Sequence, residues 1–333
     1  MIPTKPFLRF LYIGFFSPLV SFHVSAFILT PRQSSNSSTN STNNDGVHLA
    51  VSPKCASSLT GNVSDISAGL LPLSSYKTIV AFGDEYTSGG EQNGSALLPA
   101  QLSGTDPRAG GRFSNGPVWV ENLASDVGAK LMDYATAGAV TDNMVWPSKK
   151  DANDFVNQTN VFTSQHDDLD PNTTLLTVFF GINDFAASEV DNTEYFQLAA
   201  DAIVYQIEVL ASSPPYAKHF LVLDNYGRGS SSPAGDAYKQ SVFEGLNALH
   251  TKLGLNVGYV DFKTVWDGVL HNPGYAAFGY SNQGFCTTST TTVGKCDDPE
   301  HTFYWIDGYP SKETHRIMAD YVKDVMANCT ASG

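Results

Sequence analysis

Short apolar runs alternate along the chain with longer segments in which apolar residues recur at helical spacing. The runs predict strands over Thr78–Phe82, Thr174–Phe180, His219–Leu223 and Asn256–Phe262. Their continuous apolar character is typical of strands that are covered on both faces. The periodic segments predict helices over Pro117–Val127, Tyr195–Ser212, Ser241–Leu253 and Ser311–Met326. This alternation favours an α/β fold in which a mostly parallel sheet lies between helices.

Two of the predicted strands end in turns that carry polar residues. Gly83-Asp84-Glu85 follows the first strand, and Gly181-Ile182-Asn183-Asp184 follows the second. In open α/β sheets, functional groups gather at the carboxyl ends of the strands. We therefore expect both turns to line one crevice.

These turns, and the segments between and after them, resemble the sequence blocks of the SGNH (GDSL) esterases. Matching segments run in the family's order from about Lys77 to the C-terminus: Thr78–Thr87, Gly111–Trp119, Asp133–Ala139, Gly181–Asp184 and Cys296–Trp305. The likeness is greatest to secreted fungal acetylesterases of the carbohydrate-esterase type. The resemblance implies a three-layer α/β/α sandwich with a mostly parallel five-stranded sheet of the flavodoxin-like kind. It also implies that the Gly138 amide and the Asn183 side chain form an oxyanion hole, with Gly83, Asp84, Gly181 and Asp184 as further motif residues.

The positions of the catalytic triad depart from the family pattern. The family has a nucleophilic serine after Gly-Asp, where this chain has Glu85. Aligning the end of the chain on Trp305 and Pro310 places Ile306 at the aspartate position and Tyr309 at the histidine position, with Asp307 one residue late. A serine esterase needs the nucleophile, a base and a group that orients the base. We therefore expect a pseudoenzyme in which Glu85 fills the old oxyanion hole and accepts hydrogen bonds from Gly138, Asn183 or Tyr309.

Other residues near these turns are candidate replacements for the missing groups. Thr87 and Ser88 are interpreted as residues that satisfy the turn rather than as nucleophiles, and His315 as a packing residue of the last helix. A carboxylate mechanism would pair Glu85 with another acid, and the sequence offers Asp84, Asp184 and Asp307. Four aromatic residues are possible ligand platforms, although aromatics beside a sheet usually belong to the core: Tyr86, Trp146, Tyr226 and Trp305.

The first residues predict export. Lys5 and Arg9 precede an apolar run from Phe10 to Phe22, followed by small residues at 24–26, the order of a secretory signal peptide. We expect a signal peptide over residues 1–26, a Ser/Asn/Thr-rich disordered tether and N-terminal extension over 27–75, and one SGNH-like domain over 76–333. No later stretch is long and apolar enough to predict a membrane span. The predicted location is extracellular.

Glycosylation acceptors and cysteines fit that compartment. The Asn-x-Ser/Thr acceptors are Asn36, Asn40, Asn62, Asn93, Asn157, Asn172 and Asn328. The short separation of Cys286 and Cys296 favours a disulfide between them, which leaves Cys55 and Cys329 as a second pair, although two other connectivities exist. The spacing of His and Cys is not that of a metal site, and neither a metal nor a cofactor is expected.

The formal net charge of −14 bears on partners. An acidic surface repels phosphate backbones, so nucleic-acid binding is disfavoured. Three functional hypotheses remain: a pseudoenzyme that binds an acylated saccharide, a small ester or a protein partner in its crevice; a carboxylic-ester hydrolase, resembling the carbohydrate acetylesterases, with a rearranged site; and a structural cell-wall or surface glycoprotein. The sequence carries no signal for the oligomeric state.

Overall fold

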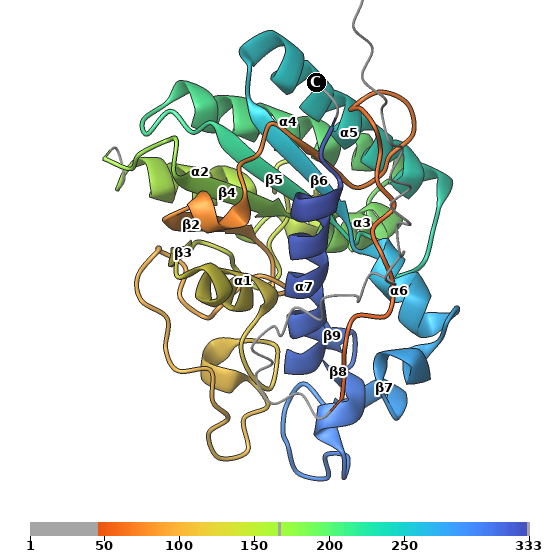
Figure 1. Cartoon of the computed structure of the whole chain (residues 1–333). Coiled ribbons are helices and arrows are strands. Elements are labelled where there is room, and N and C mark those ends of the chain that lie inside the picture. Colours follow the sequence, from red (N-terminus) through yellow and green to blue (C-terminus); the bar gives the residue numbers. More distant parts are fainter. Residues whose placement is uncertain (1–45, 166–167, 332–333) are drawn as a thin grey trace, which may run out of the picture. The chain divides into compact units, whose positions relative to one another are not determined.

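Six strands form the central sheet of a computed structural model that describes residues 46–165 and 168–331, all within one compact unit (Figure 1). The strands are β1 Ile66–Ala68, β2 Thr78–Gly83, β3 Lys130–Asp133, β4 Thr174–Phe179, β5 His219–Asp224 and β6 Asn256–Asp261. Their order is β1-β6-β5-β4-β2-β3, with β1 antiparallel to β6 and the other neighbours parallel. The sheet thus has one strand more than the five expected, because β1 adds an antiparallel edge strand to five parallel strands.

Helices cover both faces of this sheet. They are α1 Trp119–Val127, α2 Phe155–Thr163, α3 Ile182–Val190, α4 Phe196–Ser212, α5 Pro233–Leu253, α6 Lys263–Leu270 and α7 Lys312–Asn328. Single 3-10 turns lie at Leu73–Ser75, Ala109–Gly111, Pro147–Lys149, Thr193–Tyr195, Tyr275–Phe278 and Pro299–His301. Alternate strand residues enter separate cores: Val80 and Phe82 share one with α2, α4 and α5, whereas Ile79 and Ala81 share the other with α1, α6 and α7. The result is the three-layer α/β/α sandwich that was expected.

The ends of the helices explain where the predicted boundaries were right and wrong. Gly254 stops α5 in the left-handed conformation at φ 67°, as expected from its place after the helix. The same helix begins at Pro233 rather than Ser241, because Ser232 caps it by accepting a hydrogen bond from the Gly235 amide. The first turns of α5 are polar and carry little apolar periodicity, so the pattern missed them.

A second, three-stranded sheet carries the end of the predicted site. It consists of β7 Asn282–Thr287, β8 Thr302–Ile306 and β9 Tyr309–Pro310, in that order. Strands β8 and β9 are antiparallel, and Ile306 lies directly opposite Tyr309. Cys286 of β7 forms a disulfide with Cys296.

Residues 46–75 belong to the same fold as the rest, which corrects the expected domain boundary at residue 76. Ile66 of β1 is fully buried and pairs with Tyr259 of β6. A disulfide joins Cys55 to Cys329, so both expected cysteine pairs are confirmed. Only the segment before residue 46 has the polar composition on which the tether was predicted. That segment, the predicted signal peptide and the acceptors Asn36 and Asn40 lie outside the described residues.

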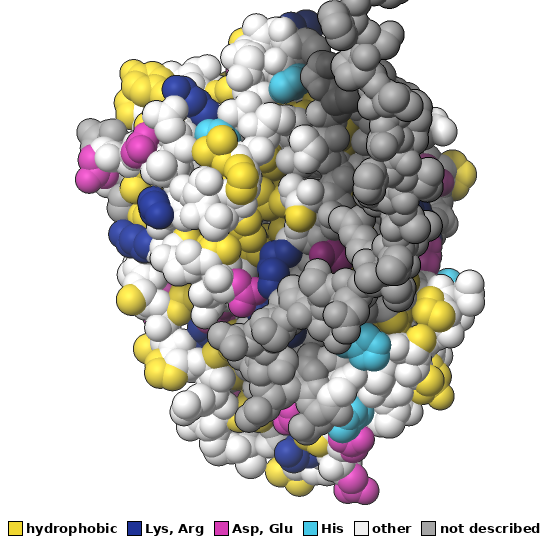
Figure 2. Space-filling model, viewed as in Figure 1, with side chains coloured by type: hydrophobic (Ala, Val, Ile, Leu, Met, Phe, Trp, Pro, Cys, Tyr) yellow, Lys and Arg dark blue, Asp and Glu magenta, His cyan; other side chains and the backbone are white. Residues whose placement is uncertain are grey.

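None of the described helices combines the length and the apolar character that a membrane crossing requires. On the face drawn in Figure 2, Lys and Arg side chains are interspersed with Asp and Glu rather than gathered in one patch.

Candidate functional site

The turn after β2 is held by its neighbours independently of residue 85. The Gly83 amide donates to Gln158 Oε1 at 3.0 Å, and Gln158 Nε2 donates to the Gly83 carbonyl at 2.9 Å. A Cβ at residue 83 would lie 2.8 Å from the Phe179 carbonyl oxygen, so only glycine fits between the strands. Asp84 is fully buried and its Oδ1 accepts the Tyr86 amide at 2.9 Å. These contacts fix the backbone from which the side chain of residue 85 projects.

Glu85 occupies the position expected for an oxyanion. Its Oε2 accepts the Gly138 amide at 2.7 Å and Asn183 Nδ2 at 3.0 Å. The side chain is only 6% exposed. Both donors that the sequence assigned to the oxyanion hole therefore converge on a single carboxylate oxygen. Hydrogen bonds to an ionised acceptor are about twice as strong as neutral ones, so this contact is a strong one.

The two donors come from loops that a second carboxyl group ties together. Gly138 lies in the loop after β3 at φ 78°, and Asn183 lies in the first turn of α3 after Gly181 at φ 114°. Asp184 Oδ1 accepts from the Thr141 amide and hydroxyl at 2.9 and 2.7 Å and from Trp146 Nε1 at 2.8 Å. This network holds the loop that carries Gly138 against the helix that carries Asn183.

Two buried carboxyl groups lie behind this contact. Burial, followed by the negative charge of Glu85, holds the pKa of Asp84 well above its ordinary value. Burial likewise raises the pKa of Asp184, against the hydrogen bonds that lower it. In the described part of the chain, neither Asp84 Oδ2 nor Asp184 Oδ2 has a hydrogen-bond partner. Both groups brace the site through their Oδ1 atoms, Asp84 by accepting the Tyr86 amide and Asp184 by accepting from Thr141 and Trp146.

Tyr309, which the sequence resemblance placed at the histidine position, lies beside Glu85. Burial, followed by the charge of Glu85, raises the pKa of Tyr309 to about 12. Its ring packs against Phe113, with centroids 4.9 Å apart, and against Tyr86 at 6.4 Å. The hydroxyl keeps its proton at neutral pH, so it cannot take a proton from a nucleophile. Of the three donors expected for Glu85, only Tyr309 makes no hydrogen bond to it.

Ile306 is the last residue of β8, whereas Asp307 lies in the two-residue turn that joins β8 to β9. Ile306 is 1% exposed and packs with Cys286 and Trp305. Asp307 is exposed and makes no hydrogen bond or ion pair with the described residues. The position opposite Tyr309 is thus apolar, and the nearby carboxylate faces elsewhere.

The remaining polar residues of the predicted site have structural roles. Thr87 Oγ1 accepts Trp119 Nε1 at 3.2 Å, and Ser88 is 4% exposed with its amide bonded to the Asp84 carbonyl. His315 is 1% exposed, its Nδ1 accepts the Trp119 amide at 3.3 Å, and burial lowers its pKa to about 3. His315 is therefore a neutral packing residue.

The four aromatic residues that were possible ligand platforms lie inside the protein. Tyr86 and Trp146 are fully buried, and Tyr226 and Trp305 are at most 2% exposed. The platform interpretation was wrong, because flat apolar rings next to a sheet gain more from burial in the core than from a place on the surface.

Sequence reasoning missed Arg228, which lies beside this site. It follows β5 between two glycines and takes the left-handed conformation at φ 47°. Its guanidinium contacts the Tyr86 hydroxyl, and its Nη1 lies 2.6 Å from where a Cβ at Gly308 would be. With Asp307 and Tyr304 it lines a cleft of about 450 Å³. The Gly-Arg-Gly turn at the carboxyl end of a predicted strand was the available signal.

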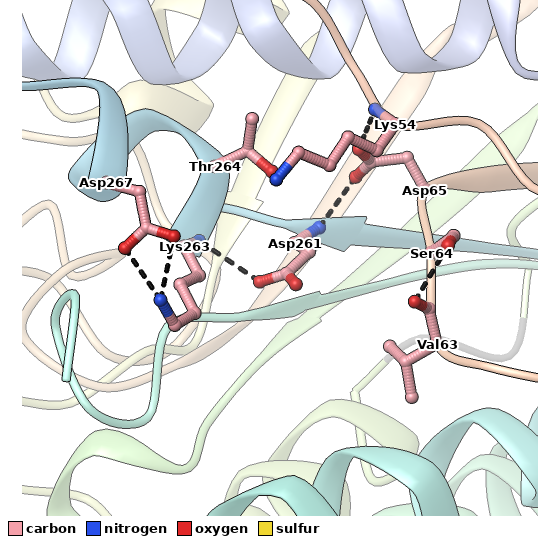
Figure 3. A pocket seen from close by; sticks show the side chains of 8 residues that line it. All are labelled: Lys54, Val63, Ser64, Asp65, Asp261, Lys263, Thr264 and Asp267. Atoms are coloured by element: carbon pink, nitrogen blue, oxygen red, sulfur yellow. Dashed lines mark hydrogen bonds and ion pairs between the residues drawn. The ribbon is translucent and has the colours of Figure 1, made fainter. Parts of the chain in front are cut away.

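A smaller cavity of about 180 Å³ lies at the carboxyl end of β6 (Figure 3). Asp65 Oδ1 accepts the Asp261 amide at 2.8 Å and its Oδ2 accepts the Lys54 amide at 2.9 Å. Lys263 Nζ binds both carboxylate oxygens of Asp267, at 2.6 and 2.7 Å. Because these polar groups form hydrogen bonds and an ion pair with one another, we interpret the cavity as a structural feature rather than a ligand site. The described residues contain no group of three or more side chains suited to hold a metal ion.

The sandwich fold and the Gly-Asp turn at the end of β2 define the class of the protein, and comparison with known sequences gives its family. The GDSL-like Lipase/Acylhydrolase family model matches residues 79–322. A GDSL esterase/lipase of Arabidopsis thaliana is 22% identical over 309 residues, covering 72% of this chain and 85% of that protein. The chain belongs to the GDSL-like lipase/acylhydrolase family.

Solved structures with a similar fold are distant in sequence. A member of the lipolytic G-D-S-L family from Veillonella parvula is 16% identical, with a TM-score of 0.42 over 75% of this chain and 98% of that one. A catalytic mutant of Axe2, an acetylxylan esterase from Geobacillus stearothermophilus, is 12% identical, with a TM-score of 0.40 over 77% and 97%.

Proposed function

We propose that this family member does not hydrolyse esters by serine chemistry and instead acts as a binding protein. The observation that carries the proposal is the pair of hydrogen bonds from Gly138 and Asn183 to Glu85 Oε2. A substrate carbonyl oxygen would have to displace a carboxylate that already satisfies both donors. An oxyanion hole works because its donors are free to meet developing charge, and here both donors already bind a carboxyl oxygen.

The base side of the site supports the same proposal. Tyr309 keeps its proton, and Ile306 offers no oxygen to orient a base. In a triad whose members act as a unit, loss of the nucleophile or the base costs about 10⁶ in turnover. The chain would therefore react with esters no faster than the residual rate that binding alone supplies.

One observation favours a second candidate, a carboxylic-ester hydrolase with a rearranged site. Glu85 Oε1 accepts no hydrogen bond from the residues that the structure describes. A free carboxylate oxygen is able to activate a water molecule. This candidate requires Glu85 to remain ionised while both donors hold its other oxygen.

Hydrolysis of p-nitrophenyl acetate and of acetylated xylo-oligosaccharides by the purified protein separates the two candidates. We expect equal, background rates for the natural protein and for Glu85→Ala, and no labelling by a fluorophosphonate, which needs an activated serine. Turnover that Glu85→Ala and Glu85→Gln abolish would establish the hydrolase instead. Glu208→Ala, an exposed glutamate on α4, is the matched control.

We also propose that the protein is exported and glycosylated. Two disulfides are typical of an oxidising compartment. The described acceptors are all exposed: Asn62, Asn93, Asn157, Asn172 and Asn328. Expression from the full-length reading frame in a secreting eukaryotic host should yield protein in the medium whose mass falls on treatment with an N-glycosidase.

A further inference from the structure

We propose that the cleft formed by Arg228, Tyr304 and Asp307 is a binding site for a neutral saccharide. The proposal rests on the proposed function, because it assigns a ligand class to a crevice that binds rather than hydrolyses. The cleft also includes Gly227 and Gly308, and its volume of about 450 Å³ lies within the range of small-molecule sites, roughly 300–1,000 Å³.

Arg228 is held in place as a hydrogen-bond donor for a ligand. Its φ of 47° is costly for a residue with a side chain, by about 1–2 kcal/mol, and it lies next to glycine on both sides. The guanidinium contacts the Tyr86 hydroxyl, which itself donates to the Gly308 carbonyl. Within the described residues Arg228 forms no ion pair with any carboxylate, so its remaining N–H groups are available to the cleft.

Asp307 supplies acceptors in the same cleft. Its side chain is exposed and makes no hydrogen bond or ion pair with any described residue. Arg228 and Asp307 thus line one cleft without forming a salt bridge with each other, and Arg228 interacts with the Tyr86 hydroxyl instead. The cleft offers separate donors and acceptors, and it carries no net charge from this pair.

Tyr304 adds a further donor. Its hydroxyl accepts Trp266 Nε1 at 2.8 Å, and burial raises its pKa to about 12, so the hydroxyl proton stays in place. Because the Tyr304 oxygen already accepts a hydrogen bond from Trp266, the Tyr304 hydroxyl is expected to act toward a ligand as a hydrogen-bond donor. The half-buried ring of Tyr304 also provides an apolar surface.

A neutral saccharide matches this set of groups. Neighbouring hydroxyls donate to a carboxylate and accept from a guanidinium and a phenol, and the C–H face of a sugar ring packs on an aromatic ring. A polyanion would engage Arg228 but meet Asp307 and the net charge of −14. The cleft adjoins the Glu85 site, because Tyr309 interacts electrostatically with both Glu85 and Arg228.

The test is binding of the full-length secreted protein to an array of neutral hexasaccharides (xylo-, cello- and manno-hexaose), with polygalacturonate as the anionic comparison. Titration calorimetry then measures the dissociation constant of the best hexasaccharide. We expect Asp307→Asn and Arg228→Gln each to weaken it by roughly tenfold or more, and Glu208→Gln to leave it unchanged. Asp307 contacts no described side chain by hydrogen bond or ion pair, so Asp307→Asn carries the test even if Arg228→Gln fails to fold.

The proposal is overturned if no neutral hexasaccharide binds, or if Asp307→Asn binds as tightly as the natural protein. Binding of polygalacturonate that strengthens in Asp307→Asn would replace the neutral ligand with an anionic one. The esterase assay on the same samples separates this outcome from failure of the proposed function. Ester turnover that depends on Glu85 refutes the pseudoenzyme whatever the array shows, whereas absent turnover with absent binding refutes the saccharide site alone.

Discussion

Replacing Glu85 by alanine tests whether this carboxylate stabilises the fold. Its Oε2 accepts two hydrogen bonds, from Gly138 and Asn183. Hydrogen bonds to a charged group contribute roughly 1.5–3 kcal/mol each. Two effects reduce that sum in Glu85→Ala: water reaches the uncovered donors, and the repulsion between Glu85 and Asp84 disappears. We expect the free energy of unfolding to fall by about 1–3 kcal/mol.

Urea denaturation followed by tryptophan fluorescence measures this change, with Glu208→Ala as the exposed control. In a domain of this size, about 1 kcal/mol lowers the melting temperature by roughly 2–4 °C. A double-mutant cycle with Asn183→Ala isolates the contact, and we expect a coupling energy of about 1–2 kcal/mol. A catalytic group held under strain behaves in the opposite way, since its removal stabilises the protein. If Glu85→Ala is more stable than the natural protein, or if the coupling with Asn183 is zero, the reasoning is refuted.

Three further perturbations have defined outcomes. Burial, followed by a hydrogen bond with Glu300, raises the pKa of Glu313 from 4.5 to about 8. Because this pKa is higher in the folded than in the unfolded protein, Glu313 contributes fully to the free energy of unfolding below about pH 4.5. That contribution is lost as the pH rises toward 8. Urea titrations from pH 5 to 9 should therefore show the natural protein losing stability relative to Glu313→Gln, by at most about 1.4 kcal/mol per pH unit, and parallel curves would contradict this. Glu85→Ser alone should hydrolyse p-nitrophenyl acetate at the background rate, because Tyr309 cannot act as a base. Activity should rise only when Tyr309→His and Ile306→Asp are added to it. Activity in the single variant would mean that another residue acts as the base. Joint replacement of Cys55 and Cys329 by serine removes a disulfide between residues 274 positions apart. The free energy of unfolding, measured by thermal or urea denaturation, should fall by about 2–5 kcal/mol. An unchanged unfolding midpoint would mean that β1 packs on the sheet equally well without the disulfide.

Continuous apolar strands were the most readable part of the sequence. The bounds of β2, β4, β5 and β6 differ from the predicted ones by at most one residue, since each strand is buried on both faces. β3 is short and begins with exposed Lys130, and β1 has three residues, so neither carries a distinctive pattern. Helices α2, α3 and α6 have eight or nine residues and were missed, whereas α1, which has nine, was predicted with Pro117 at its start.

The residues of the candidate site likewise include some that the sequence predicted and one that it did not. The resemblance to the family brought Glu85, Gly138 and Asn183 together, because the order of the blocks encodes which strand ends meet. Asp307, which lies one residue past the aspartate position, is exposed because it belongs to the turn between β8 and β9, whereas Ile306 is the buried last residue of β8. Arg228 could not be found in this way. Its proximity to Tyr86 and Gly308 depends on how the turn after β5 meets the end of β8, and no local pattern records that approach.

The bond pair between Gln158 and Gly83 has a consequence for engineering. The side chain at position 85 can be replaced without loss of the contacts that hold its backbone. Those contacts are made by Gly83, which binds Gln158 of α2, and by Asp84, which binds the Tyr86 amide. A cysteine, a histidine or an unnatural amino acid placed there would inherit the same direction toward Gly138 and Asn183. The scaffold thus separates where a reactive group sits from what that group is.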